Sequence, residues 1–195
     1  MHFEPNNIYH IFNRGNQKQQ LFFSDANYLY FLEKFRKNIF SSCEILNWCL
    51  MPNHFHFLIY VTDKSCELVP NRLIPIQNLS EQFRITLSGY TKGIQKQEQI
   101  TGNLFQQNTQ AKLIGSDNYR YSVQAFHYIH QNPMKASLVN KMEDWRYSSF
   151  QDYIGIRNRN LCSKALAKQL LDFNEANLYK ESYNVIPDKD VPFFT

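Results

Sequence analysis

The stretch Glu44–Thr62, which reads EILNWCLMPNHFHFLIYVT, decides the fold of this protein. It contains two apolar runs, residues 44–50 and 54–62, that are joined by the tripeptide Met51–Asn53. Three connecting residues that include proline and asparagine are typical of a tight antiparallel connection. The stretch therefore predicts two adjacent antiparallel strands.

The second run alternates two kinds of side chain. One face of the predicted strand would carry Phe55, Phe57, Ile59 and Val61, and the other would carry His54, His56, Leu58 and Tyr60. Two imidazoles at positions i and i+2 of a strand point the same way and are able to ligate one divalent cation. For an isolated His-x-His the alternative is a pair of partly exposed histidines on a polar strand face.

The rest of the chain surrounds these strands with helices. We predict further strands over 8–14 and 104–107, and we leave open whether the latter resumes at 111–114. We predict helices over 25–41, 78–93 and 117–132. Residues 63–77 are predicted to form a loop. The last helix is expected to end near Asn132, because Pro133 disfavours helical backbone at the residue before it. This order predicts an α+β domain with a mainly antiparallel sheet. The segment after 151 reads as a helical or irregular extension.

The last predicted helix carries a tyrosine away from its apolar stripe. Phe126 and Ile129 fall on one apolar arc, whereas Tyr128 lies about 160° from Phe126 around the helix. Asn132 follows Tyr128 by one turn and is its neighbour on the same face. Helical tyrosines more often fill a core, but this position off the stripe favours a functional role. His130 falls on the apolar side and is interpreted as structural.

Together these residues suggest phosphodiester chemistry. A divalent metal held by His54, His56 and the amide of Asn132 would polarise a phosphodiester. The hydroxyl of Tyr128 would then attack phosphorus and form a covalent phosphotyrosine, which divides one difficult step into two. A phenol has an ordinary pKa of about 10, so the attack needs the metal or a neighbouring base.

Charge is unevenly distributed along the chain. Of its 195 residues 43% are hydrophobic and 19% charged, which excludes collagen-like and disordered proteins. From residue 84 to 141, seven Lys or Arg outnumber two acidic residues, whereas acids prevail after 172. This pattern points to a polyanionic partner, with a solvated face of mixed charge as the alternative.

The cysteines and the apolar runs of the sequence indicate the cellular compartment of the protein. The four cysteines form no Cys-x-x-Cys pair, which predicts reduced thiols in a cytoplasmic protein. The N-terminus has no signal-peptide pattern, and no apolar run is long enough to cross a bilayer, so no membrane association is expected.

Five motifs follow one another in a recognisable order. They are Tyr9-His10-x-x-x-Arg14-Gly15-Asn16, Leu50-Met51-Pro52-Asn53-His54-Phe55-His56-Phe57-Leu58, Gly102-Asn103-Leu104-Phe105-Gln106, Tyr128-Ile129-His130-Gln131-Asn132-Pro133 and Trp145-x-x-Ser148-Ser149. In this order they resemble the REP-associated tyrosine transposases, which are relatives of the insertion-sequence 200-like single-tyrosine transposases of the HUH superfamily. The resemblance covers residues 8–153.

The resemblance implies a ferredoxin-like or RRM-like antiparallel sheet flanked by helices, the HUH nuclease fold. It implies a transposase domain over 1–153 and a C-terminal extension over 154–195. It also implies cleavage and rejoining of single-stranded, hairpin-bearing DNA through a 5′-phosphotyrosine, with Mg²⁺ or Mn²⁺ as the cofactor.

Site residues are carried over by position. By resemblance His54 and His56 are the metal ligands, Tyr128 is the nucleophile and Asn132 is the candidate third ligand. Weaker candidates for DNA contact are Arg14 and Asn53 beside the inferred site and Arg120 and Lys135 in the basic segment. The residues Gln107–Gln110 stand where relatives often carry basic side chains, which is the main departure.

The sequence leaves three questions open. Tyr128 would serve the histidine pair of its own chain or of a second subunit, and the protein would be a monomer or a homodimer. A non-catalytic, RRM-like module that binds single strands by stacking bases is one rival. A metal-dependent phosphoesterase in which water attacks is the other.

Overall fold

The computed structural model describes residues 1–114, 119–184 and 186, with only the backbone at 119 and 120. Four strands form one sheet in the order β2-β3-β1-β4, and each neighbouring pair is antiparallel. Their bounds are Ile8–Arg14 for β1, Glu44–Met51 for β2, His54–Tyr60 for β3 and Gln110–Leu113 for β4. This strand order is that of a ferredoxin-like sheet.

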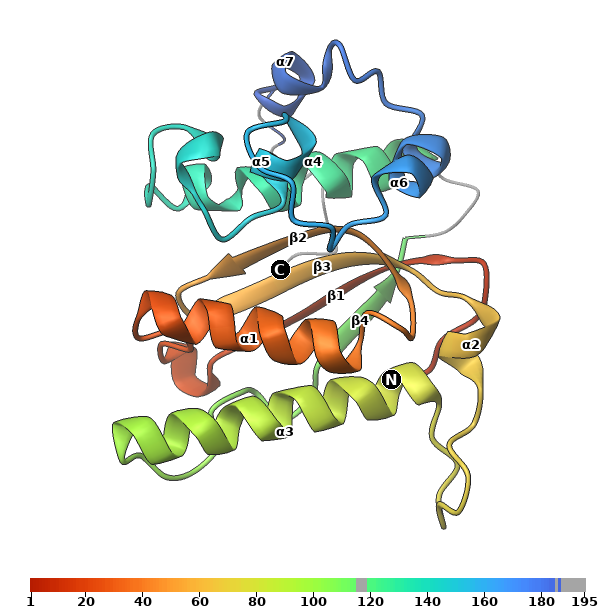
Figure 1. The fold of residues 1–195 in the computed structure, drawn as a ribbon, viewed down its shortest axis with the longest axis vertical. Coiled ribbons are helices and arrows are strands. Elements are labelled where there is room, and N and C mark those ends of the chain that lie inside the picture. Colours follow the sequence, from red (N-terminus) through yellow and green to blue (C-terminus); the bar gives the residue numbers. More distant parts are fainter. Residues whose placement is uncertain (115–118, 185, 187–195) are drawn as a thin grey trace.

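Helices cover both faces of the sheet (Figure 1). One layer contains α1, Asp25–Asn38, and α3, Asn78–Glu98, with the single turn α2, Asp63–Cys66, beside them. The other layer contains α4, Tyr119–Lys135, and the shorter α5, Phe150–Tyr153, α6, Lys164–Leu171, and α7, Leu178–Ser182. The predicted α+β class and the antiparallel sheet flanked by helices are confirmed.

The alternation along β3 separates two hydrophobic cores. Phe55, Phe57 and Ile59 belong to the cluster under α1 and α3. Leu58 belongs to the cluster with Phe126 and other residues of the α4 layer. The predicted division of the strand into two faces is confirmed, and it places His54 and His56 on the α4 side of the sheet.

The helix α3 continues past the predicted end at Gly93 to Glu98. Ile94 is buried in the core directly after the glycine, and good helix formers follow it. Gly93 is a close-packing position, because a Cβ atom there would lie 2.8 Å from the ring of Tyr30. The glycine therefore lets two helices approach and does not end one.

The edge strand also differs from the prediction. Only Phe105 of the predicted strand 104–107 pairs, through an isolated bridge to Gly15, and the continuous strand is β4 at Gln110–Leu113. Leu104 and Phe105 are buried, so this apolar pair fills the core without extending the sheet.

Within the predicted loop 63–77, α2 and a bridge between Leu68 and Gln77 add local structure. α1 ends at Asn38, three residues before the predicted end.

The predicted end of the last helix at Asn132 is wrong, because α4 contains Pro133 and continues to Lys135. The side-chain Nδ2 of Asn132 donates to the carbonyl oxygens of Tyr128 at 3.0 Å and Ile129 at 3.5 Å. Ile129 is the residue whose carbonyl the missing N–H of the proline would have met. The asparagine amide thus partly replaces that bond. The predicted start, at Ser116–Asp117, lies outside the described residues.

The C-terminal helices pack on α4. Ala167, Leu171, Phe173 and Leu178 share one buried cluster with Phe126. None of the four cysteines forms a disulfide, as expected. In the described ranges, no helix has the length and apolar character needed to cross a membrane.

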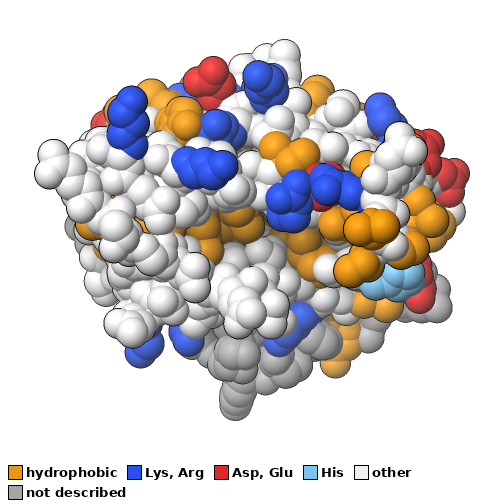
Figure 2. All heavy atoms as spheres, turned by 90° about the horizontal axis from the view of Figure 1, so that it is seen from below, with side chains coloured by type: hydrophobic (Ala, Val, Ile, Leu, Met, Phe, Trp, Pro, Cys, Tyr) orange, Lys and Arg blue, Asp and Glu red, His pale blue; other side chains and the backbone are white. Residues whose placement is uncertain are grey.

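Figure 2 shows the face covered by α3, over which Lys and Arg side chains are scattered among a few acidic ones. White surface, meaning backbone and uncharged polar side chains, dominates the left half of this view, toward the C-terminal end of α3. Apolar atoms line a hollow near the centre. Residues from α3 and from 103–109 border a groove of about 430 Å³ on this side.

Candidate functional site

The loop between β2 and β3 fixes the first histidine. Nδ1 of His54 donates a hydrogen bond to Oδ1 of Asn53 at 2.7 Å. This bond leaves Nε2 of His54 with its lone pair, the form in which imidazole binds a metal. Burial, and then the charge of Arg14, lowers the pKa of His54 to about 4, so the ring is neutral at neutral pH.

The second histidine, His56, contacts a third histidine, His10. The rings of His54 and His56 lie 4.9 Å apart between centroids, and Nδ1 of His56 lies 2.9 Å from Nε2 of His10 on β1. When His56 donates the hydrogen of this bond, its Nε2 keeps a lone pair on the opposite side of the ring. Burial, and then the neighbouring histidines, holds the pKa of His56 well below 6.5. His10 was missed as a site residue.

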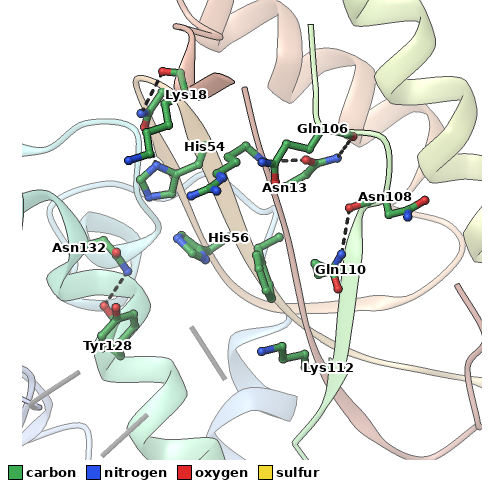
Figure 3. Close-up of a pocket in the computed structure, with 13 residues that line it drawn as sticks. Asn13, Lys18, His54, His56, Gln106, Asn108, Gln110, Lys112, Tyr128 and Asn132 are labelled. Atoms are coloured by element: carbon green, nitrogen blue, oxygen red, sulfur yellow. Dashed lines mark hydrogen bonds between the residues drawn. The ribbon is translucent and has the colours of Figure 1, made fainter. Parts of the chain in front are cut away.

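The helix α4 presents Tyr128 and Asn132 across from His54 and His56 (Figure 3). All four residues line one pocket of about 510 Å³. Tyr128 is only 8% exposed, although it lies off the apolar stripe of the helix. Nζ of Lys135 lies 4.4 Å from the centroid of the Tyr128 ring. One chain therefore brings together the tyrosine, the histidine pair and the amide that were predicted from sequence.

The pocket carries positive charge. Its lining residues are Phe12, Asn13, Arg14, Lys18, Asn53, His54, His56, Gln106, Asn108, Gln110, Lys112, Tyr128 and Asn132. Three cations and no carboxylate stand among these described residues, and such a wall suits an anion. Arg14 and Asn53 lie here as predicted. Lys135 is absent from the lining and donates to the carbonyl of Ile186 at 3.0 Å.

The predicted basic segment does not form one surface. Among the Lys and Arg residues of the segment 84–141 whose side chains the structure describes, only Lys112 lines the pocket. Arg84 on α3 is absent from the pocket lining and is paired with Glu81 at 2.7 Å. The side chain of Arg120 lies outside the described residues. Arg14 and Lys18, the other two pocket cations, come from an N-terminal part of the chain that the charge count did not single out.

The donor set is suited to a divalent cation. It offers two neutral imidazoles and the carboxamide oxygen of Asn132, whose NH₂ group is turned back to the helix. Across the described ranges, no group of three or more His, Cys, Asp and Glu side chains is placed to hold a metal, so further ligands here would be oxygens of water or of a bound phosphate. Imidazole ligands favour Mn²⁺ over Mg²⁺, which prefers oxygen.

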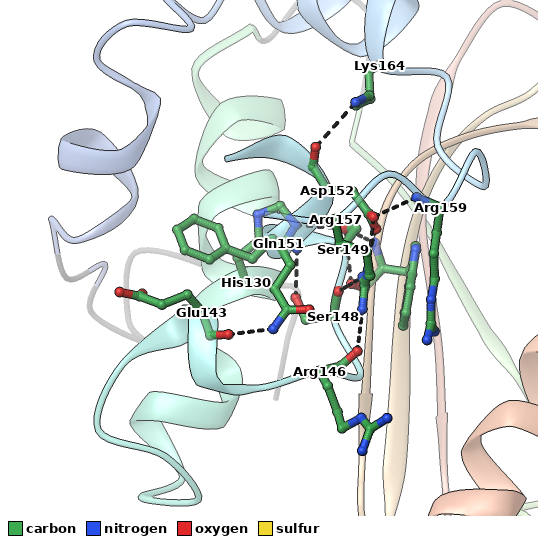
Figure 4. A network of polar contacts seen from close by, with 12 residues as sticks. His130, Glu143, Arg146, Ser148, Ser149, Gln151, Asp152, Arg157, Arg159 and Lys164 are labelled. Carbon is green, nitrogen blue, oxygen red and sulfur yellow. Dashed lines mark hydrogen bonds and ion pairs between the residues drawn. The ribbon is translucent and has the colours of Figure 1, made fainter. Parts of the chain in front are cut away.

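Two polar contacts seat α4 on the sheet. Nδ2 of Asn47 on β2 donates to the carbonyl oxygen of Phe126 at 2.8 Å. Oγ of Ser149 accepts from the backbone N–H of Trp48 at 3.0 Å and lies 2.8 Å from Nε2 of His130 (Figure 4). His130 is fully buried, in agreement with its interpretation as structural. The role of Asn47 was missed, because an asparagine inside an apolar run gives no signal of its partner.

An ion pair holds the segment that carries Ser149. Arg157 and Asp152 pair at 2.7 Å with little exposure of either side chain. Nη1 of Arg157 also donates to the carbonyl of Arg146 at 2.6 Å, and the N–H of Arg159 donates to Asp152 at 2.9 Å. Figure 4 shows these residues around the turn that follows Trp145-x-x-Ser148-Ser149. This motif therefore has a structural function, the fixing of α4 against β2.

Comparisons with known proteins concern the fold. No protein-family model and no curated protein sequence matches the chain. A solved structure, described as a REP-associated tyrosine transposase bound to a REP hairpin, is similar with a TM-score of 0.57 and 17% identity. The similarity covers 83% of this chain and 87% of that one. At this identity the likeness establishes a shared fold.

The seating of α4 is testable through Ser149. In Ser149→Ala, the buried N–H of Trp48 and the ring of His130 both lose a hydrogen-bond partner. We expect the free energy of unfolding to fall by about 2 kcal/mol in urea denaturation. Ser41→Ala, at an exposed position, is the control and should change it by less than about 0.5 kcal/mol. Equal stability of the two variants would contradict this role of Ser149.

Proposed function

We propose that this protein is a metal-assisted nuclease and strand transferase that cleaves and rejoins single-stranded, hairpin-bearing DNA through Tyr128. One observation carries the proposal: Tyr128 and Asn132 on α4 line the same cation-walled pocket as His54 and His56 on β3. A buried tyrosine, two neutral imidazoles and a carboxamide form a set that binding alone would not require. The proposal needs no residue from a second chain.

The chemical step exchanges one phosphate ester for another. The phenolic oxygen of Tyr128 forms a bond to phosphorus while the bond from phosphorus to the 3′ oxygen of the preceding nucleotide breaks. The proton that Tyr128 loses balances the proton that the 3′ oxygen gains. The products are a 5′-phosphotyrosine and a free 3′ hydroxyl, and attack by a 3′ hydroxyl reverses the step and rejoins the strand.

The residues around Tyr128 support this step electrostatically. Lys135 holds a positive charge over the Tyr128 ring, 4.4 Å from its centroid, and this charge would stabilise the phenolate that forms as the proton leaves. Arg14, Lys18 and Lys112 line the pocket and would bind the phosphates on either side of the cleaved bond. The proposal thus gives Lys135 a role at the nucleophile.

His54, His56 and Asn132 would hold the metal, and Asn53 would orient His54 through its hydrogen bond. A bound divalent cation supplies Lewis-acid stabilisation of the negative charge on the phosphate. All three protein donors are neutral, so the charge of the cation remains available to an anionic substrate. This matches the absence of carboxylates from the described lining of the pocket.

Two separate observations support the choice of DNA substrate. The motif order resembles that of REP-associated tyrosine transposases, and the similar solved structure was bound to a REP hairpin. The pocket that would receive the cleaved phosphate is lined by residues of β1, β3, β4 and α4. We therefore propose DNA with an unpaired segment next to a hairpin.

Tyr128→Phe tests the nucleophile. The ring stays in place, but the hydroxyl that forms the ester is lost. We expect cleavage of a labelled hairpin oligonucleotide with Mn²⁺ to fall at least about a thousandfold, with little change in binding. The measurements are gel-resolved cleavage rates and fluorescence anisotropy.

Tyr121→Phe is the matched control, since Tyr121 lies on the same helix and is 39% exposed outside the pocket lining. It should keep the wild-type rate. Cleavage that survives in Tyr128→Phe would mean that water attacks, as in a phosphoesterase. Binding without cleavage by the wild-type protein would indicate a non-catalytic module.

The metal site is tested by Mn²⁺ titration without DNA, followed by calorimetry. His54→Ala and His56→Ala should each weaken Mn²⁺ binding at least about tenfold, because each removes one ligand. Asn53→Ala should weaken it about tenfold through loss of the orientation of His54. His2→Ala, at an exposed histidine, is the control. Unchanged binding in both ligand variants would refute the site.

A further inference from the structure

A buried histidine next to the pocket has no role in the chemical step. His10 on β1 is fully buried and is not among the described residues that line the pocket of Tyr128. A buried imidazole is stable only when its polar atoms have hydrogen-bond partners. For Nε2 of His10 that partner is Nδ1 of His56, at 2.9 Å. One of these two nitrogens therefore carries the hydrogen, and the other accepts it.

The pairing of β1 with β3 holds the two rings in the orientation that this bond needs. The ring centroids of His10 and His56 lie 5.0 Å apart and the ring planes differ by only 14°, so the N–H of one ring is directed at the lone pair of the other. Phe12, which is opposite His56 in the strand register, lies nearly parallel to the His10 ring at 4.7 Å. The sheet thus fixes the place of His10 before any ligand binds.

The direction of this hydrogen bond decides whether His56 is able to bind a metal. A neutral imidazole carries a hydrogen on one nitrogen and a lone pair on the other. If His10 were the donor, Nδ1 of His56 would accept, and the hydrogen of His56 would occupy Nε2 and leave no lone pair for a metal. If His56 is the donor, its Nε2 keeps the lone pair that a metal ligand requires.

We infer that His10 is a positioning residue for His56 and fixes it in the tautomer that has its hydrogen on Nδ1. The inference rests on the proposed function, in which His56 holds the metal. His10 then accepts through Nε2 and carries its own hydrogen on Nδ1. Histidines that bind metals generally donate their second ring N–H to an acceptor that sets the tautomer and the ring orientation. In this protein a neutral ring takes that place.

Neutral acceptors orient both histidines of the pair. The acceptor for Nδ1 of His54 is the amide oxygen of Asn53, which is able only to accept, so the direction of that bond is fixed by chemistry. Nδ2 of Asn53 donates in turn to the carbonyl of Lys18 at 3.4 Å. A carboxylate in the place of His10 would also orient His56, but it would add a negative charge close to the phosphate. An imidazole acceptor avoids this repulsion.

The first test measures the tautomers in the metal-free full chain. Two-bond ¹⁵N–¹H correlation spectra at about pH 8, where imidazole is neutral, distinguish a ring nitrogen with a hydrogen from one without. We expect the hydrogen on Nδ1 in both His10 and His56 of the wild-type protein. His10→Leu removes the acceptor and should give a mixture of tautomers at His56. His10→Gln places an amide oxygen near the position of Nε2 and should restore the Nδ1 form.

The second test measures Mn²⁺ binding by calorimetry without DNA. His10→Leu should weaken binding about tenfold, and His10→Gln should recover most of this loss. The matched controls are His127→Leu and His127→Gln, which alter a buried histidine that bonds to Oγ of Ser182 at 2.8 Å and is not among the described residues of the pocket lining. Both controls should bind Mn²⁺ as the wild-type protein does. Thermal melting checks that each variant is folded.

A hydrogen on Nε2 of His56 in the metal-free wild-type protein overturns the inference, and this measurement needs no variant. Equal loss of Mn²⁺ binding in His10→Leu and His10→Gln would assign His10 to packing alone and also overturns it, as does unchanged binding in His10→Leu. In these last two cases the metal site of the proposed function stands. Failure of the wild-type protein to bind Mn²⁺ overturns that metal site, and the inference with it.

Discussion

The packing of α4 across one face of the sheet is the constraint on which the candidate site depends. Phe126 and Ile129 are buried against that face, so the helix cannot rotate without exposing them. The bonds from Asn47 and Ser149 fix its position along β2. Only with the helix in this place do Tyr128 and Asn132 meet the pocket of His54 and His56.

The electrostatics of the pocket are a second constraint on the site. Burial keeps the imidazoles of His54 and His56 neutral, so they are suited to bind a metal and do not add positive charge. The fixed positive charges come from Arg14, Lys18 and Lys112, which line the pocket. A metal bound by neutral donors would add its charge to theirs, and this sum suits a phosphodiester better than a small neutral substrate.

Local patterns predicted much of this molecule. The alternation in β3 and the angular offset of Tyr128 from Phe126 are properties of single elements, and both hold in the structure. Contacts between distant segments were not predictable in this way. His10 meets His56 only through the pairing of β1 with β3, and Lys112 reaches the pocket only because β4 pairs with β1. Pro133 misled because the amide of Asn132 partly replaces the hydrogen bond that the proline lacks, and Gly93 misled because it is a close-packing position inside α3.

The central claim is that Tyr128 forms a covalent ester with DNA. The most direct measurement is incubation of the protein with a labelled, hairpin-bearing single strand and Mn²⁺, followed by denaturing electrophoresis and peptide mass mapping. The account predicts a protein–DNA adduct whose modified peptide contains Tyr128, together with a free 3′ hydroxyl on the released strand. Cleavage without an adduct, or an adduct at another residue, would contradict it.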